Sequence, residues 1–228
     1  MQLAELGKVV VVSPHLDDAV LSCGELIGAC PGTRVLTVFA GMPPDPAMLT
    51  EWDRVSGFDS AAAAIGARRE EDRRALALLD AVPSWLEFCD SQYRHSPAVA
   101  ELAGALTEAI GALGPDSVVL PCGLFHSDHL LVHRAMMAAR ARVGARHWLL
   151  YGDALYRRIP GLLQEGLQRV SDEGAQPLPI AFIGAEASAR KREAISCYAS
   201  QLRALQATTE HGHADALAAE SYWRLAPR

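Results

Sequence analysis

Two short clusters of histidine and aspartate contain the residue types that hydrolytic metal sites use. The first cluster is SPHLDD at residues 13–18, and the second is HSDH at residues 126–129. Imidazole nitrogens and carboxylate oxygens are good ligands for Zn²⁺, and a catalytic zinc keeps three protein ligands and one open position. His15, Asp18 and His129 would supply such a set. Either cluster alone could be a polar turn, but together they favour a metal site.

Plainer interpretations exist for several of these polar residues. Either aspartate of the first cluster could cap the helix that follows it. Arg68 and Glu71 lie three residues apart on a predicted helix, a spacing at which solvated ion pairs form. His133 follows His129 by four residues, a spacing that can chelate zinc, but a fourth protein ligand would close the open position. We therefore favour a supporting or packing role for His133, and a turn role for Asp153.

Short apolar runs and amphipathic segments alternate along the chain and would position these clusters. The predicted strands are Val9–Ser13, Arg34–Ala40, Trp85–Phe88, Ser117–Leu120, His147–Tyr151 and Ile180–Ile183. The predicted helices are Asp18–Ala29, Ser60–Asp80, Pro97–Leu113, Leu130–Arg142, Gly161–Ser171 and Ser188–Ala207.

This alternation predicts an α/β fold, a Rossmann-like three-layer sandwich with a mostly parallel sheet and helices on both faces. We see no composition shift or linker, so we expect residues 1–228 to form a single domain. Both clusters follow predicted strands, and ligands of open α/β sheets bind beyond the carboxyl ends of the strands. We therefore expect the clusters to meet at one sheet edge, with Gly41–Ser56 and Ile159–Pro179 shaping the pocket.

Composition excludes several functional classes. The 228 residues carry a formal net charge of −6, which argues against non-specific nucleic-acid binding. No run of 18 apolar residues is present, so we expect no membrane span. The five cysteines include no C-x-x-C pair, which indicates a reducing compartment. The first residues lack the features of a signal peptide, so we expect a cytoplasmic protein.

Four motifs in order resemble those of the LmbE / PIG-L family of zinc-dependent N-acetylglucosaminyl deacetylases. The family pattern A-H-P-D-D-E corresponds to SPHLDDAVLSCGE, and H-P-D-H corresponds to HSDH. The pattern R-x-x-E-x-x-x-A-x-x-x-L-G corresponds to Arg68, Glu71, Ala75, Leu79 and Asp80. The pattern K-x-x-A-x-x-x-[HY]-x-S-Q corresponds to Lys191, Ala194, Tyr198, Ser200 and Gln201. The resemblance therefore covers residues 15 to 201, which is most of the chain.

The resemblance implies roles for individual residues. One zinc ion per chain, with Fe²⁺ or Co²⁺ as alternatives, would be held by the two histidines and the aspartate named above. Asp17 would be the general base that takes a proton from the water bound to the metal. His126 would act as the acid or oxyanion stabiliser, with Asp128 orienting it. Arg68 would grip the polar part of the substrate.

The chain departs from the family motifs without losing these groups. Ala19 replaces an acidic residue, Leu16 and Ser127 replace prolines, and Asp80 replaces a glycine. None of these changes removes an implied ligand or the implied base. We therefore expect an amide hydrolase that removes an acetyl group from an N-acetylglucosamine-type amino sugar or glycoside. Its partner would be a small N-acylated amino sugar, and the resemblance is compatible with a homo-oligomer.

Four other functions remain open from the sequence. One is an amidase that acts on a thiol conjugate or another N-acyl substrate. A second is a metal-dependent phosphoesterase, which usually needs two metals and more carboxylates than these clusters supply. A third is a cofactor-binding protein, although no G-x-G-x-x-G follows the first strand. The fourth is an inactive family member that serves as a binding module.

Overall fold

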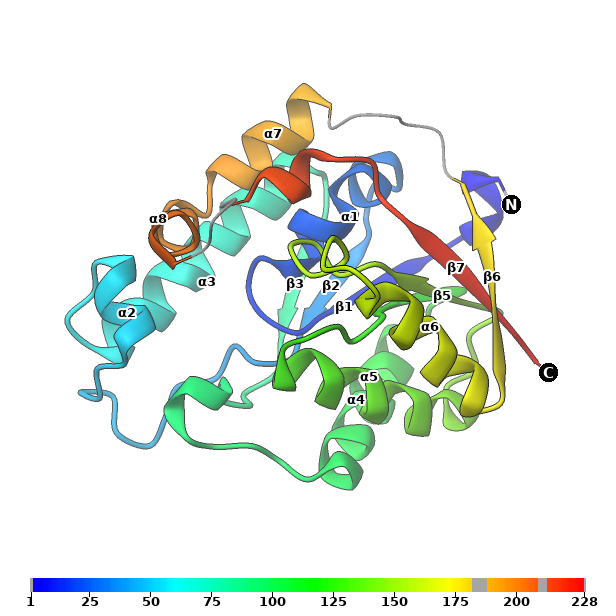
Figure 1. Ribbon diagram of the computed structural model, residues 1–228, viewed down its shortest axis with the longest axis horizontal. Helices are drawn as coiled ribbons and strands as arrows, with labels where there is room; N and C mark the ends of the chain where they lie inside the picture. Colours follow the sequence, from blue (N-terminus) through cyan, green and yellow to red (C-terminus); the bar gives the residue numbers. More distant parts are fainter. Residues whose placement is uncertain (1, 182–187, 209–212, 228) are drawn as a thin grey trace.

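The computed structural model describes residues 2–181, 188–208 and 213–227 and is built around a seven-stranded sheet. The strand order is β3-β2-β1-β4-β5-β7-β6 (Figure 1). Strands β1 to β5 are parallel, and β7 runs antiparallel to both of its neighbours. The strands are β1 (Val9–Ser13), β2 (Arg34–Thr37), β3 (Val82–Trp85), β4 (Ser117–Pro121), β5 (His147–Tyr151), β6 (Ala175–Ile180) and β7 (Tyr222–Pro227).

Helices cover both faces of the sheet, which confirms the predicted three-layer arrangement. One face packs against α1 (Asp18–Ala29), α3 (Ala61–Leu78) and α7 (Ala189–Ser196). The other packs against α4 (Val99–Leu113), α5 (Ser127–Ala139) and α6 (Leu162–Asp172). The remaining helices are α2 (Glu51–Ser56), α8 (Ala199–Thr208) and the 3-10 turns Leu3–Leu6, Ser91–Tyr93, Arg140–Arg142 and Ala214–Leu217.

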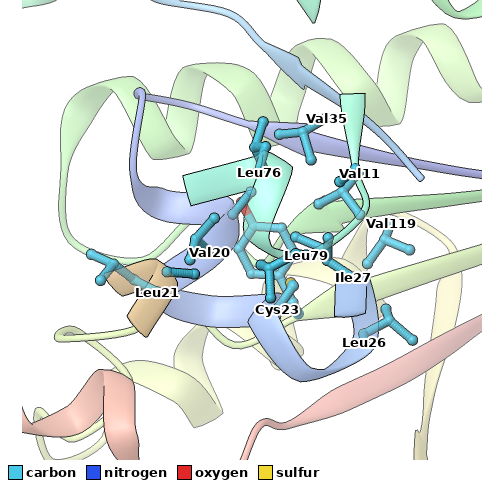
Figure 2. Close-up of a cluster of buried hydrophobic side chains, with 14 of the residues drawn as sticks. Val11, Val20, Leu21, Cys23, Leu26, Ile27, Val35, Leu76, Leu79 and Val119 are labelled. Carbon is cyan, nitrogen blue, oxygen red and sulfur yellow. The ribbon is translucent and has the colours of Figure 1, made fainter. Parts of the chain in front are cut away.

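The all-apolar run of β1 explains its central place. Every residue of β1 is buried, because successive side chains point into opposite helical layers. Val11 packs in the layer that contains α1 and α3, whereas Val10 and Val12 pack in the layer that contains α4 and α5. Figure 2 shows the first of these clusters, where Val11 and Val35 from the sheet face Ile27 of α1.

The direction of chain winding reverses between β1 and β4. From β1 the chain proceeds outward to β2 and β3, then returns to form β4 on the other side of β1. The loops that leave β1 and β4 therefore diverge, which opens a crevice at the carboxyl ends of these two strands. Both polar clusters of the sequence lie in this crevice.

Some predicted boundaries are wrong. Helix α5 begins at Ser127 and not at Leu130, which places most of the second cluster in the first helical turn. The predicted helix over Ser188–Ala207 is two helices, α7 and α8. Strand β3 begins three residues earlier than predicted, and β6 ends at Ile180, where a strand was predicted to begin. Residues 182 and 183 of that predicted strand lie outside the described residues.

Two elements were not expected at all. Helix α2 forms within the segment predicted as a loop after β2, and Thr50 caps it by accepting a hydrogen bond from the backbone N–H of Asp53. The C-terminal segment forms β7, which pairs with β5 on one side and β6 on the other. Within the described ranges, no helix has both the length and the hydropathy that crossing a membrane requires.

Candidate active site

The loop after β1 folds back on itself and aims its polar side chains into the crevice. The hydroxyl of Ser13 donates to the carbonyl oxygen of His15 (2.6 Å) and accepts from the backbone N–H of Ala19 (3.0 Å). The backbone N–H of His15 donates to Oδ2 of Asp18 (2.8 Å). Asp17 occupies the N-cap position of α1, but its side chain makes no capping hydrogen bond. The interpretation of Asp17 as a helix cap is therefore wrong, since Ser13 serves the first helical turn.

The second cluster is held by the start of α5. His126 is the N-cap residue, and its Nδ1 accepts a hydrogen bond from the backbone N–H of Asp128 (3.2 Å). Asp128 and His129 therefore lie in the first turn, and both are almost fully buried. A helix N-terminus also favours the negative charge of the Asp128 carboxylate.

The crevice brings His15, Asp18 and His129 together. Oδ2 of Asp18 lies 3.0 Å from Nδ1 of His15 and 3.1 Å from Nε2 of His129. One ligand atom from each residue lies within 4.8 Å of the other two. The buried Nε2 of His129 makes no well-aligned hydrogen bond and faces the carboxylate of Asp18, as expected for two atoms that would share a metal. These three residues therefore fit a divalent cation.

In His15 and His129, the ring nitrogen that points away from Asp18 faces another carboxylate. Nδ1 of His129 lies 2.6 Å from Oδ1 of Asp153, and Nε2 of His15 lies 3.0 Å from Oδ2 of Asp128. Histidines that ligate metals almost always donate their other ring N–H to such a group, which sets the tautomer and directs the free nitrogen at the metal. This pattern is the strongest structural support for a metal at these three residues.

A second group, made of His15, His126 and Asp128, also has ligand atoms within 4.8 Å of one another. Nδ1 of His126, however, already accepts the N–H of Asp128, and Oδ2 of Asp128 accepts the backbone N–H of Ser91 (3.1 Å). In the first group the ligand nitrogens of His15 and His129 face Oδ2 of Asp18, which is itself a ligand atom, so the first group is the better site. His133 belongs to neither group: it is buried, with Nδ1 2.9 Å from the carbonyl oxygen of Pro121.

The carboxyl group of Asp17 lies beside these ligands and is tuned for proton exchange. Burial and the negative charge of Asp18 raise the pKa of Asp17 to about 7. Burial opposes ionisation of Asp18 too, but His129 and His15 hold the pKa of Asp18 well below its usual value. Two adjacent carboxyl groups thus differ in proton affinity. A cation on the three ligands would favour ionised Asp17, as the imidazolium charges do.

The environment of His126 differs from that of the other two histidines. Burial and the charges of His15 and His129 lower the pKa of His126. Burial also works against protonation of His129, but Asp18 and Asp153 outweigh it and raise the pKa of His129 to about 9. Asp128 was expected to orient His126. It does so through its backbone N–H, because its carboxylate Oδ2 lies 3.9 Å from Nδ1 of His126 and only 3.0 Å from Nε2 of His15.

Four of these side chains, from His15, Asp17, Asp18 and His126, line a cavity of about 290 Å³. All five parallel strands supply lining residues through the loops or helices that follow them, and α8 supplies two more. Of the segments expected to shape the pocket, residues 41–56 contribute Trp52, whereas residues 159–179 contribute nothing. The lining residues are His15, Leu16, Asp17, Asp18, Phe39, Trp52, Ile65, Arg68, Asp90, Gln92, His126, Leu155, Tyr156, Gln201 and Leu205.

Arg68 reaches this cavity from α3. Its side chain is buried, and its Nη2 donates to Oδ1 of Asp53 (2.7 Å) and to the hydroxyl of Ser56 (3.4 Å). Its Nε has no hydrogen-bond partner. Glu71 instead accepts from the backbone N–H and the hydroxyl of Ser200. The interpretation of Arg68 and Glu71 as a solvated ion pair is therefore wrong.

Sequence reasoning missed several residues of the site. Asp153, for which a turn role was favoured, supports His129 and accepts the backbone N–H of Gly123 (3.0 Å). Its position directly beyond β5 was the signal that could have identified it. Trp52 and Gln201 are joined by a 2.9 Å hydrogen bond across the cavity wall, and nothing in their local sequence predicts that contact.

Comparison with known proteins gives concordant similarities. Residues 10–140 match the family described as PIG-L, GlcNAc-PI de-N-acetylase. The chain is 30% identical over 172 residues to a 2'-N-acetylparomamine deacetylase of Streptomyces fradiae. This match covers 66% of the chain. The match spans only 58% of that relative.

Solved structures share the fold. The A40926 pseudoaglycone deacetylase superposes with a TM-score of 0.75 at 25% identity, covering 97% of this chain and 98% of that one. A zinc-inhibited teicoplanin deacetylase gives 0.72 at 24% identity, with the same coverage. A 4-carboxy-2-hydroxymuconate hydratase of Pseudomonas putida gives 0.59 at 20% identity, covering 97% of each chain. The last two likenesses concern the fold alone, which serves both deacetylases and a hydratase.

Proposed function

Because this chain belongs to the PIG-L family, we propose that it is a metal-dependent amide hydrolase that removes an acetyl group from an N-acetylglucosamine-type amino sugar or glycoside. The observation that carries the proposal is the pair of carboxylate-supported imidazoles, whose other ring nitrogens lie 3.0 and 3.1 Å from Oδ2 of Asp18. The curated relative is named for the same reaction on an amino sugar.

His15, Asp18 and His129 would hold the ion, with zinc as the first choice and Fe²⁺ or Co²⁺ as alternatives. When bound, such an ion lowers the pKa of water and polarises an amide carbonyl. Asp17 takes the proton of the attacking water, since a cation on the three ligands would keep its carboxyl ionised and able to accept that proton. After attack, the same carboxyl can give this proton to the leaving amine nitrogen as the C–N bond breaks, which yields acetate and the free amine.

His126 faces the reacting group from the start of α5. Because Nδ1 accepts the N–H of Asp128, His126 carries its ring proton on Nε2 and can donate a hydrogen bond from there to the developing oxyanion. The carboxylate of Asp128 holds His15 in place. Arg68 would bind the polar part of the substrate where its side chain lines the cavity, while Asp53 keeps the guanidinium in position.

The first test combines metal content with acetate release from a panel of N-acetylglucosaminides. We expect about one zinc per chain and acetate release. One metal without acetate would move the activity to another acyl group or to a thiol-conjugate amide. Two tightly bound equivalents would favour a phosphoesterase, and no metal after reconstitution would overturn the ligand assignment.

The second test is the variant Asp17→Asn. We expect it to keep the metal and lose most turnover, because the amide cannot accept the proton of the attacking water. Asp172→Asn is the matched control, since Asp172 is exposed at the end of α6 and does not line the cavity. Full turnover in Asp17→Asn would overturn the assignment of the base.

A further inference from the structure

Phe125 is strained and exposed beside the reacting centre. Its backbone has φ +59°, and the N–H of His126 donates to the carbonyl oxygen of Leu124 (2.7 Å), which closes a tight γ-turn around it. Such turns are rare for side chains larger than glycine. The Phe125 side chain is also 65% exposed, the highest value among the large apolar side chains in the described part of the chain.

The surrounding structure enforces this turn. Nη2 of Arg169 donates to the carbonyl oxygens of Cys122 and Gly123, and Asp153 accepts the N–H of Gly123. The chain thus enters the Phe125 turn along a fixed path. Strained conformations persist where neighbouring contacts over-determine them, and they concentrate at functional sites.

Phe125 stacks on a residue of the cavity wall. Its ring lies 5.3 Å from the ring of Tyr156, with an angle of 29° between the planes. Tyr156 lines the cavity and meets His129 edge-on, also at 5.3 Å. Tyr156 follows a second strained residue, Leu155 at φ +74°, whose N–H donates to Oδ2 of Asp215 (2.9 Å). Two residues with positive φ, Phe125 itself and Leu155, therefore hold an aromatic pair of which Tyr156 lines the cavity.

We propose that the Phe125–Tyr156 pair binds an apolar aglycone attached to the reacting sugar, an inference that rests on the proposed function. Tyr156 lines the cavity, and Phe125, which stacks on Tyr156 and directly precedes His126, is exposed to solvent. Because Phe125 adjoins His126 in the chain, the group that would contact its ring is a substituent of the substrate whose amide reaches His126. Aromatic faces favour apolar and aromatic partners, so a glycoside with an apolar substituent fits better than a free sugar.

The test compares the phenyl and methyl β-glycosides of N-acetylglucosamine. We expect Phe125→Ala to lower the ratio of kcat/KM for the phenyl over the methyl glycoside by about 2- to 10-fold. Phe125→Trp should restore the preference. Val82→Ala is the matched control, because Val82 is an exposed apolar residue (39%) at the start of β3, away from the carboxyl edge of the sheet.

Stability and direct binding complete the test. Phe125→Gly should lose the preference while its melting temperature stays equal or rises, since glycine tolerates positive φ. Saturation-transfer NMR can measure the binding of both glycosides to Asp17→Asn and to Asp17→Asn/Phe125→Ala without turnover. The phenyl glycoside should bind more tightly than the methyl glycoside only where Phe125 is present. If the wild type releases no acetate, the proposed function fails, but a phenyl preference that depends on Phe125 still supports the aromatic site.

Three outcomes overturn the inference. The first is an unchanged phenyl-to-methyl ratio in Phe125→Ala, both in turnover and in binding. The second is an equal loss of kcat on both glycosides, which would make the turn a positioning device for His126. The third is a Phe125-dependent change in sedimentation of the protein alone or with phosphatidylcholine vesicles, with no effect on glycosides. That result would assign Phe125 to self-association or to a membrane surface.

Discussion

The substitution Asp153→Asn tests how the structure prepares His129 to hold a metal. The carboxylate of Asp153 is fully buried and accepts two hydrogen bonds, from Nδ1 of His129 (2.6 Å) and from the backbone N–H of Gly123 (3.0 Å). Asparagine offers one oxygen and one NH₂ group, so it can satisfy only one of these donors. The substitution keeps the shape of the side chain and removes one acceptor.

Either orientation of the amide weakens the site. If the NH₂ group faces His129, Nδ1 must become an acceptor and the ring proton moves to Nε2, the atom that would ligate the metal. If the NH₂ group faces Gly123, two buried donors oppose each other, which costs about 1–3 kcal/mol. We expect metal affinity to fall by about 10- to 100-fold, or roughly 1.4–2.7 kcal/mol.

The assay is a competition titration of Zn²⁺ between the protein and a chromophoric chelator, with urea unfolding of the metal-free protein beside it. Asp72→Asn is the matched control, because Asp72 is another buried aspartate that accepts two side-chain hydrogen bonds but does not touch the ligands. A folded Asp153→Asn protein with an affinity within about 2-fold of the wild type would refute the reasoning. His129 would then not depend on Asp153 for its tautomer.

Three other predictions follow from buried charges and from the metal. Burial raises the pKa of Asp72 to about 6, so the folded protein binds this proton more tightly than the unfolded chain and loses stability as pH rises from about 4 to about 6. Asp72→Asn can still bond to both Trp85 and Tyr198, so it should exceed the wild type in unfolding free energy by up to ~3 kcal/mol more at pH 7 than at pH 4. Urea titrations in which the difference between variant and wild type is the same at both pH values would contradict this. Lys191→Met breaks the buried 2.7 Å ion pair with Glu220 and should lower the unfolding free energy in urea by about 3–5 kcal/mol. Adding Glu220→Gln should recover part of that free energy, because it removes the unpaired buried charge. An unchanged urea midpoint in Lys191→Met would show that the pair contributes nothing. A chelator should abolish acetate release and lower the melting temperature, and added Zn²⁺ should restore both; activity that survives complete metal removal, checked by elemental analysis, would argue against metal-dependent hydrolysis.

The local sequence was sufficient to predict the architecture. Buried parallel strands are short apolar runs that end at a proline or a polar turn, and Val9–Ser13 and His147–Tyr151 were predicted with their observed bounds. The alternation of such runs with amphipathic helices leaves few topologies besides a doubly wound sheet. In that topology strand ends share one edge, so the sequence alone predicted that residues 13–18 and residues 126–129 would meet.

Other features depended on contacts between residues that are distant in the sequence. The C-terminal strand β7, YWRLAP, contains apolar residues but no β-branched run, and it forms because β5 and β6 offer it backbone partners. Only the folded chain brings Asp153 to His129, Trp52 to Gln201, and Phe125 to Tyr156. The sequence determined which groups could do the chemistry, because residue type and local periodicity are local properties. Tertiary structure decided which ring nitrogens face Asp18, which carboxyl has a raised pKa and which ring faces solvent, because these depend on the burial and charge that distant segments supply.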